Sequence, residues 1–191
     1  SLGETMADDV YDIYAIRYGH HHRKSSENFI GGDPHDMPQP LDYFVWAIVG
    51  AHGTFIVDTG FDEIMAQKRQ RQLTNPIREG LKAIEIDPET VENVIVTHLH
   101  YDHAGNYELF PRARYHLQDV EMGYATGRCM CHALLRFPFE VDDVVAMEGR
   151  DRDERHVARA DPLYVLYGVA RLDDVVVVAA EGDHRTPDLG E

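Results

Sequence analysis

Residues 98–103 of this chain read His-Leu-His-Tyr-Asp-His and directly follow the apolar residues Val94, Ile95 and Val96. A short apolar run of this kind predicts a buried strand, so the polar cluster stands at a strand end. Imidazole nitrogens and carboxylate oxygens are the usual ligands of zinc and similar divalent ions. Independent placement of residues gives such a pattern on the order of once in a few hundred sequences this rich in histidine. We therefore interpret the cluster as a metal site, with surface histidines or a purely structural site as the alternatives.

The order of the four ligand types within this run indicates two neighbouring ions. At an extended strand end His98 and His100 point to the same side, while the turn that follows brings Asp102 and His103 round to a second ion. Two adjacent divalent ions hold a bridging hydroxide and polarise a carbonyl or phosphoryl oxygen for attack. We expect one or two zinc ions bound by these four residues, a hydrolytic reaction, and a further catalytic role for Asp102 in passing a proton to the leaving oxygen.

Composition narrows the class of protein and of partner. The chain has 191 residues, of which 43% are hydrophobic and 27% charged, as is typical of one globular domain. The net charge of −16 excludes nucleic acid and an anionic membrane as partners, because both would be repelled, and we expect a small-molecule substrate. The longest apolar runs are far shorter than the about 20 residues of a membrane-spanning helix, and no signal pattern opens the chain. We expect a cytoplasmic protein whose two cysteines are reduced.

Strand and helix patterns alternate along most of the chain. A turn at residues 50–53 joins two strand patterns into a hairpin. Asn75 as the N-cap, with Pro76 in the first turn, predicts the start of a helix. This interleaving indicates an α/β protein. The predicted strands are 10–17, 41–49, 54–57, 93–97 and 113–117, and the predicted helical segments are 61–72, 76–84, 87–90 and 118–125.

Two motifs of this chain resemble those of the metallo-β-lactamase superfamily. Residues 98–103 are similar to its HxHxDH signature, and the strand 55–57 with the turn 58–60 is similar to its strand and Asp-Thr-Gly turn. Residues 8–147 as a whole resemble the branch of N-acyl-homoserine-lactonase-like hydrolases, which includes quorum-quenching lactonases.

The resemblance implies a four-layer α/β fold, the αββα sandwich, with a defined set of ligands. It implies that His98 and His100 bind the first metal, that Asp102 and His103 bind the second, and that Asp58 orients these ligands from behind. The implied reaction is the opening of a lactone or related ester ring by a zinc-bound hydroxide. A thioester or phosphoester hydrolase on the same scaffold is an alternative, because the pocket loops set the substrate.

The tail, residues 148–191, departs from the rest of the chain. It contains no Ile, Phe, Trp, Lys, Ser, Asn, Gln or Cys, yet it holds two candidate strands, 163–169 and 175–180. We therefore expect a single domain over residues 1–191 with an atypical tail. Two explanations stay open, a shortened chain or a tail read from an altered frame of a GC-rich gene.

The family's later ligands are a histidine in a Gly-His-Thr-like turn, a bridging aspartate and a last histidine, and none has a clear match in this tail. His184 is the nearest candidate for the third histidine, but its motif is imperfect and an exposed loop is the plainer interpretation. His156 lies nearby without a supporting motif. An incomplete ligand set makes a catalytically silent protein the second class of function. A chain that forms only half of the αββα sandwich would also leave one apolar face of its sheet exposed. Because such a face favours self-association, we expect a homodimer.

Other residues carry weaker signals. The segment 129–132, Cys-Met-Cys-His, is read as a packed loop near the site rather than as a second metal site. The histidines at 20–22 are read as a polar turn. The aromatic residues Tyr101, Tyr107 and Phe110 are read as core rather than as the lining of a substrate pocket.

Overall fold

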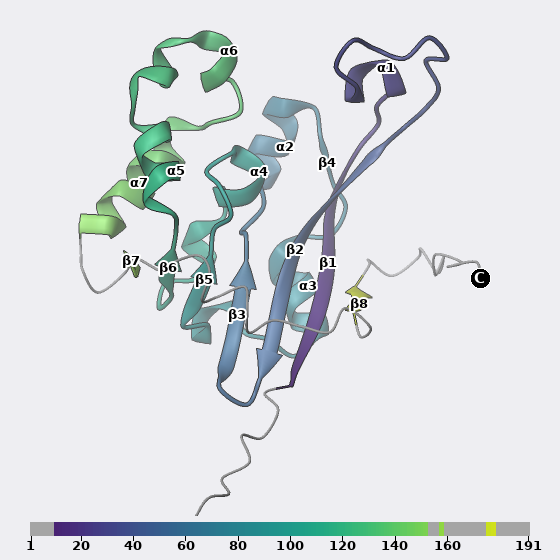
Figure 1. Ribbon diagram of the computed structural model, residues 1–191. Helices are drawn as coiled ribbons and strands as arrows, with labels where there is room; N and C mark the ends of the chain where they lie inside the picture. The colour runs from purple at the N-terminus through teal and green to yellow at the C-terminus, as the bar shows by residue number, and fades with distance from the viewer. Residues whose placement is uncertain (1–9, 153–156, 159–174, 179–191) are drawn as a thin grey trace, which may run out of the picture.

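The computed structural model describes residues 10–152, 157–158 and 175–178. The strands in these ranges form one mixed sheet in the order β4-β1-β2-β3-β5-β6-β7, and β8 also pairs with β1 (Figure 1). The strands are β1 (Tyr11–His21), β2 (Leu41–Gly50), β3 (Gly53–Val57), β4 (Gln72–Leu73), β5 (Asn93–Ile95), β6 (Arg114–His116), β7 (Val157–Ala158) and β8 (Val175–Val178).

The sheet changes direction at β3, and this change determines where the predicted cluster lies. Strand β2 runs antiparallel to its neighbours β1 and β3, whereas β3, β5 and β6 are parallel. Val57 at the end of β3 is in register with Ile95 at the end of β5, which is in register with His116 of β6. The segments that follow these three strands therefore leave the sheet at one common edge.

Helices alternate with the strands along the chain, and several of them lie at the sheet edge where β3, β5 and β6 end (Figure 1). The longest described helix, α7, follows the segment of short helices η3 and α6, which the sequence patterns did not predict. The helical elements are α1 (Ser25–Asn28), α2 (Glu63–Arg69), α3 (Ile77–Ala83), η1 (Pro88–Thr90), α4 (Tyr101–Ala104), η2 (Tyr107–Leu109), α5 (Asp119–Ala125), η3 (Arg128–Cys131), α6 (Ala133–Arg136) and α7 (Val141–Arg152).

The core lies between one face of the sheet and the helices α2 and α3. Ile16, Val45 and Ile56 from three adjacent strands pack in one cluster with Ala66 of α2 and Leu81 of α3. Each of these side chains is almost completely buried. Burial of a side chain as large as Ile or Leu stabilises a fold by about 1.5–3 kcal/mol, so this contact holds the helical layer on the sheet.

A glycine allows α3 to approach β1 closely. A Cβ atom at Gly80 would lie 2.4 Å from the Cγ2 atom of Ile16 and 3.1 Å from the Nδ2 atom of Asn75. Neither distance leaves room for a methyl group, so the helix can reach this position on the strand only without a side chain there.

The opposite face of the sheet carries apolar side chains outside this core. Because side chains alternate along a strand, Phe44, Trp46 and Ile48 face away from Val45. The rings of Phe44 and Trp46 lie 6.2 Å apart, and Trp46 is 36% exposed. The described residues thus provide one sheet and its helical layer, and a second helical layer against this face is not among them.

Most predicted elements are confirmed, and three local predictions are wrong. The helix expected over 61–72 ends at Arg69, because Gln70 adopts a left-handed conformation with φ +56° and the chain then pairs with β1 as β4. Asn75 does not cap α3, whose N-cap is Pro76 without a side-chain hydrogen bond. The histidines at 20–22 are not a turn, since β1 continues to His21 and pairs there with Leu41.

The tail predictions are tested only in part. Of the two strands expected there, 175–180 corresponds to β8, which pairs in parallel with residues 13–16 of β1, and 163–169 lies outside the described residues. In the part of the chain that the structure describes, every helix is too short or too polar to cross a bilayer.

Candidate metal centre

A buried carboxylate joins the ends of β3 and β5. Asp58 directly follows β3, is only 5% exposed, and has a left-handed backbone with φ +64°. Its N–H donates to the carbonyl of Ile95 at 2.8 Å. Its Oδ1 atom accepts hydrogen bonds from the backbone N–H and the hydroxyl of Thr97, at 2.8 and 2.9 Å. The aspartate therefore fixes the backbone from which the histidine cluster starts.

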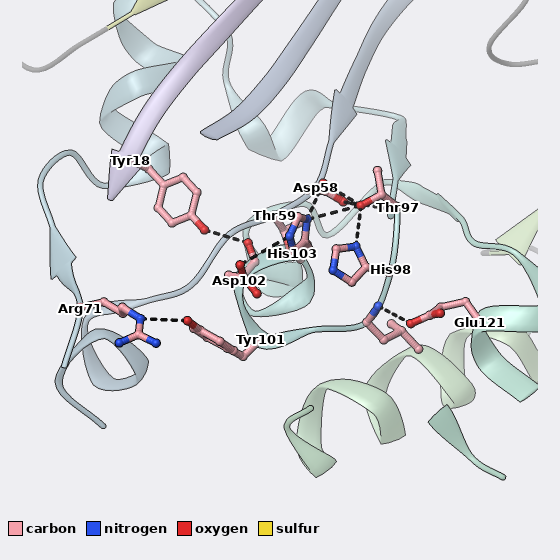
Figure 2. Close-up of polar contacts among 11 residues, drawn as sticks. Tyr18, Asp58, Thr59, Arg71, Thr97, His98, Tyr101, Asp102, His103 and Glu121 are labelled. Atoms are coloured by element: carbon pink, nitrogen blue, oxygen red, sulfur yellow. Dashed lines mark hydrogen bonds and ion pairs between the residues drawn. The ribbon is translucent and has the colours of Figure 1, made fainter. Parts of the chain in front are cut away.

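The same carboxylate also holds His103. The Nδ1 atom of His103 lies 2.7 Å from Oδ2 of Asp58, and Figure 2 shows the ring between Asp58 and Asp102. The N–H and hydroxyl of Thr59 donate to the backbone oxygen of His103 at 2.7 and 3.1 Å. With Nδ1 directed at Asp58, the Nε2 atom of His103 faces Asp102, 3.5 Å from its Oδ2. This is how a carboxylate behind a metal ligand sets the ring orientation.

The ring of His98 contacts the rings of both other histidines of the cluster. The ring of His98 lies 3.8 Å from that of His103 and 4.4 Å from that of His100, centre to centre. The hydroxyl of Thr97 lies 3.0 Å from Nδ1 of His98. Because α4 starts at Tyr101 with His100 as its N-cap, the chain turns within the motif and brings Asp102 and His103 back toward His98. The structure thus places all four predicted ligands in one loop and helical turn.

Long-range contacts position this turn from three sides. The hydroxyl of Tyr18, a fully buried residue of β1, donates to the backbone oxygen of Asp102 at 2.7 Å. The N–H of Leu99 donates to Oε1 of Glu121 in α5 at 2.8 Å. The ring of Phe139 stands edge-on against His100, with centres 4.8 Å apart.

Burial and neighbouring charges set the protonation of the cluster. Burial, together with the nearby imidazoles, lowers the pKa of His98, and burial also lowers the pKa of His100. Burial acts in the same direction on His103, but its bonds to Asp102 and Asp58 outweigh this effect and raise the pKa of His103 to about 9. Two imidazoles are therefore neutral at pH 7, which is the form that binds a metal, whereas His103 is a cation that must release its proton when it binds one.

The donors fit a divalent ion in their chemistry, but the set is incomplete. Three imidazoles and one carboxylate on a shared loop are the ligand types that zinc prefers. Among the described residues, however, no group of three or more His, Cys, Asp or Glu side chains is arranged to hold a metal ion. Further ligands would have to come from elsewhere in the chain. The weaker candidates of the tail, His156 and His184, lie outside the described residues.

Other residues that the sequence singled out lie where their plainer interpretations put them. Tyr101 and Phe110 are buried in the core, and Tyr107 packs against it. Cys129 is half-buried and Cys131 exposed, both on the short helix η3.

The sequence patterns did not identify several residues that contact this site. Thr97 is adjacent to the motif, and its place beside a strand end was a usable signal. Tyr18, Glu121 and Arg71 reach the loop from elements 20 or more residues away, Arg71 through a 3.1 Å bond from its Nε to the hydroxyl of Tyr101. Their roles depend on how the strands pair and no local pattern marks them.

Two curated proteins are similar in sequence to parts of this chain. Over 61 residues, or 32% of this chain, it is 33% identical to a probable metallo-hydrolase of Methanocaldococcus jannaschii, covering 30% of that protein. Over 129 residues, or 56% of this chain, it is 29% identical to the N-acyl homoserine lactonase AiiB of Rhizobium rhizogenes, covering 46% of it. The chain thus spans less than half the length of these curated relatives.

A solved structure extends the likeness of the fold. The dizinc quorum-quenching lactonase AidC superposes with a TM-score of 0.57 over 80% of this chain and 60% of its own, at 13% identity. The family model described as the metallo-beta-lactamase superfamily matches residues 38–185, beginning and ending later than the resemblance seen in the motifs. The predicted fold is confirmed, and the chain belongs to the metallo-β-lactamase superfamily.

Proposed function

We propose that this chain is a metal-dependent hydrolase that opens a lactone or related ester ring. In this proposal His98, His100, Asp102 and His103 bind one or two zinc ions. The observation that carries it is the contact of three imidazole rings at one sheet edge, where the buried carboxylate of Asp58 holds His103. The names of a lactonase relative and of a dizinc lactonase of similar fold support the substrate class and the metal.

The protein's own side chains have separate tasks in such a reaction. When bound, zinc supplies Lewis-acid activation of a water molecule and of the substrate carbonyl. Asp58 fixes the ring of His103, and Tyr18 fixes the backbone of Asp102. The carboxylate of Asp102 accepts the proton of the attacking water and passes it to the ring oxygen as the carbonyl C–O bond breaks. The product is then a hydroxy acid, whose new carboxyl group ionises at neutral pH and releases a proton.

A catalytically silent protein is the second candidate. It is favoured by the incomplete ligand set, because the described residues do not hold three donors arranged around one point. Such a protein would bind an ion weakly and would use the His103–Asp58 contact for stability only.

Metal content and turnover, measured on protein without a histidine tag, separate the two candidates. The hydrolase proposal predicts at least one tightly held zinc ion per chain by elemental analysis and opening of a lactone ring followed by acid release. It also predicts that His100→Ala abolishes both. His35→Ala is the matched control, because the His35 side chain is 79% exposed and, within the described part of the chain, bonds only to Asp33, so zinc content and turnover should stay unchanged. Protein that binds no zinc and opens no lactone supports the silent form.

We also propose that the chain forms a homodimer. The apolar face of the sheet with Phe44 and the 36% exposed Trp46 supports this, because apolar patches of soluble proteins mark association surfaces. Light scattering should give the mass of two chains. A mass of 21.8 kDa at high protein concentration would contradict the proposal.

A further inference from the structure

A cationic cavity lies beside the candidate metal centre. Its volume is about 670 Å³, and it lies between the end of α2 and the segment from α6 to α7. Lys68, Arg69, Arg71 and Arg136 line it, with Glu140 as the one carboxylate among its lining residues. This is unexpected in a chain of net charge −16, where cations are outnumbered almost two to one by carboxylates.

The single carboxylate does not balance these cations. Glu140 pairs with Lys68 at 2.6 Å through Oε2 and with Arg69 at 2.5 Å through Oε1. Arg71 instead contacts neutral groups, the hydroxyl of Tyr101, the Nε2 atom of His21 at 3.0 Å and the backbone oxygen of Arg69. Among the described residues, neither Arg71 nor Arg136 has a carboxylate partner.

Two of these cations, Arg69 and Arg71, contact aromatic side chains. The guanidinium of Arg69 lies 4.5 Å above the ring of Tyr101 and 4.8 Å from that of Phe137, and its side chain is only 9% exposed. Figure 2 shows Arg71 and Tyr101 pointing toward each other. A guanidinium fixed in this way loses little freedom when it binds an anion, and its planar donors match a carboxylate or phosphate.

The cavity shares a wall with the candidate centre. Phe139 lines the cavity and stands against the ring of His100, with centres 4.8 Å apart. The N–H of Tyr101 also donates to the backbone oxygen of Pro138 at 2.9 Å. A group bound in the cavity is therefore separated from the histidine cluster by about one aromatic ring.

We propose that this cavity binds an anionic group of the substrate, a carboxylate or a phosphate, and that Arg71 is its specificity-determining residue. The substrate class rests on the proposed function and becomes an acidic lactone or ester rather than one with a purely apolar chain. Binding of the anion itself does not require hydrolysis. An apolar chain in this cavity would remove water from the guanidinium groups without replacing the hydrogen bonds that the water makes, which is unfavourable.

The direct test is anion binding by metal-stripped protein at low salt. Titration calorimetry with inorganic phosphate and, separately, with glutarate should give a saturable isotherm for at least one of them, which identifies the preferred group. Arg71→Gln should weaken that binding about tenfold or more, because it removes a charge-assisted contact. Arg78→Gln is the matched control, since Arg78 pairs with Glu89 outside the cavity, and its affinity should equal that of the unmodified protein.

Two results would overturn the proposal. One is the lack of saturable binding of either anion by the unmodified protein. The other is equal affinity of the Arg71→Gln and Arg78→Gln proteins, which would reduce any binding to general charge attraction. If Arg71→Gln does not fold by circular dichroism, Arg136→Gln carries the same comparison.

Steady-state kinetics with two lactones distinguish a failure of this inference from a failure of the proposed function. Matched butyrolactones with and without a ring carboxylate should differ in KM, with the acidic one lower, and Arg71→Gln should remove the difference. Turnover of neither lactone together with Arg71-dependent anion binding refutes the hydrolase alone. Turnover with a preference for the neutral lactone refutes the anion site alone.

Discussion

Replacing Asp58 by alanine removes the acceptor of three hydrogen bonds at once. The N–H and hydroxyl of Thr97 and the Nδ1–H of His103 all end on this carboxylate, at 2.8, 2.9 and 2.7 Å. Each hydrogen bond lost in this way costs about 1 kcal/mol. Alanine at the left-handed backbone of residue 58 costs about 1 kcal/mol more, because its Cβ crowds the following carbonyl. We therefore expect Asp58→Ala to lower the free energy of unfolding by about 4 kcal/mol.

Urea denaturation at pH 7 with a chelator measures this loss without a contribution from metal. Asp62→Ala is the control, because the Asp62 carboxylate caps α2 through one bond, to the N–H of Met65 at 2.7 Å, and should cost about 1 kcal/mol. Asp58→Asn should fall between the two, because asparagine tolerates the left-handed backbone and can still accept from Thr97. Equal losses for Asp58→Ala and Asp62→Ala would refute the reasoning that one carboxylate holds the whole loop.

Two further perturbations test other parts of the structure. Gly80→Ala places a Cβ atom 2.4 Å from Ile16 and should destabilise the protein by about 1–3 kcal/mol in thermal unfolding. The control is Gly123→Ala in α5, whose Cβ atom meets no atom within 4 Å and which should be neutral or stabilising. A similar loss for both variants would contradict the close approach of α3 to β1. Burial, followed by the charges of Glu140 and Asp142, raises the pKa of Asp143 to about 7. The folded state therefore binds this proton more tightly than the unfolded chain does. The stability that this group contributes is lost as the pH rises from about 4 to 7. Asp143→Asn should therefore leave the urea midpoint unchanged near pH 4 and raise stability by about 4 kcal/mol at pH 8, and a pH-independent difference would contradict the shift.

Local patterns predicted the part of the fold that depends on local order. The hairpin of β2 and β3, the strand before the histidine cluster and the helix α3 follow from alternation and from turn residues, and they are confirmed within a few residues. Asp58 was expected behind the ligands because its motif resembles the family's, and it lies 2.7 Å from His103.

The contacts that the sequence did not predict depend on which strands pair in the sheet. Tyr18 meets Asp102 across 84 residues of sequence, and Glu121 meets Leu99 across 22. The end of α2 was misread because nothing in the polar run 67–72 marks the left-handed backbone of Gln70 or the pairing of β4 with β1. Such contacts are set by the assembled sheet and leave no local signal.

The central claim is that His98, His100, Asp102 and His103 bind a metal together. Anomalous scattering at the zinc edge, from crystals of tag-free protein grown with zinc, tests this most directly. We expect a strong peak among these four side chains, with Asp58 still bonded to His103. Zinc bound only elsewhere, with no peak in this loop, would contradict it.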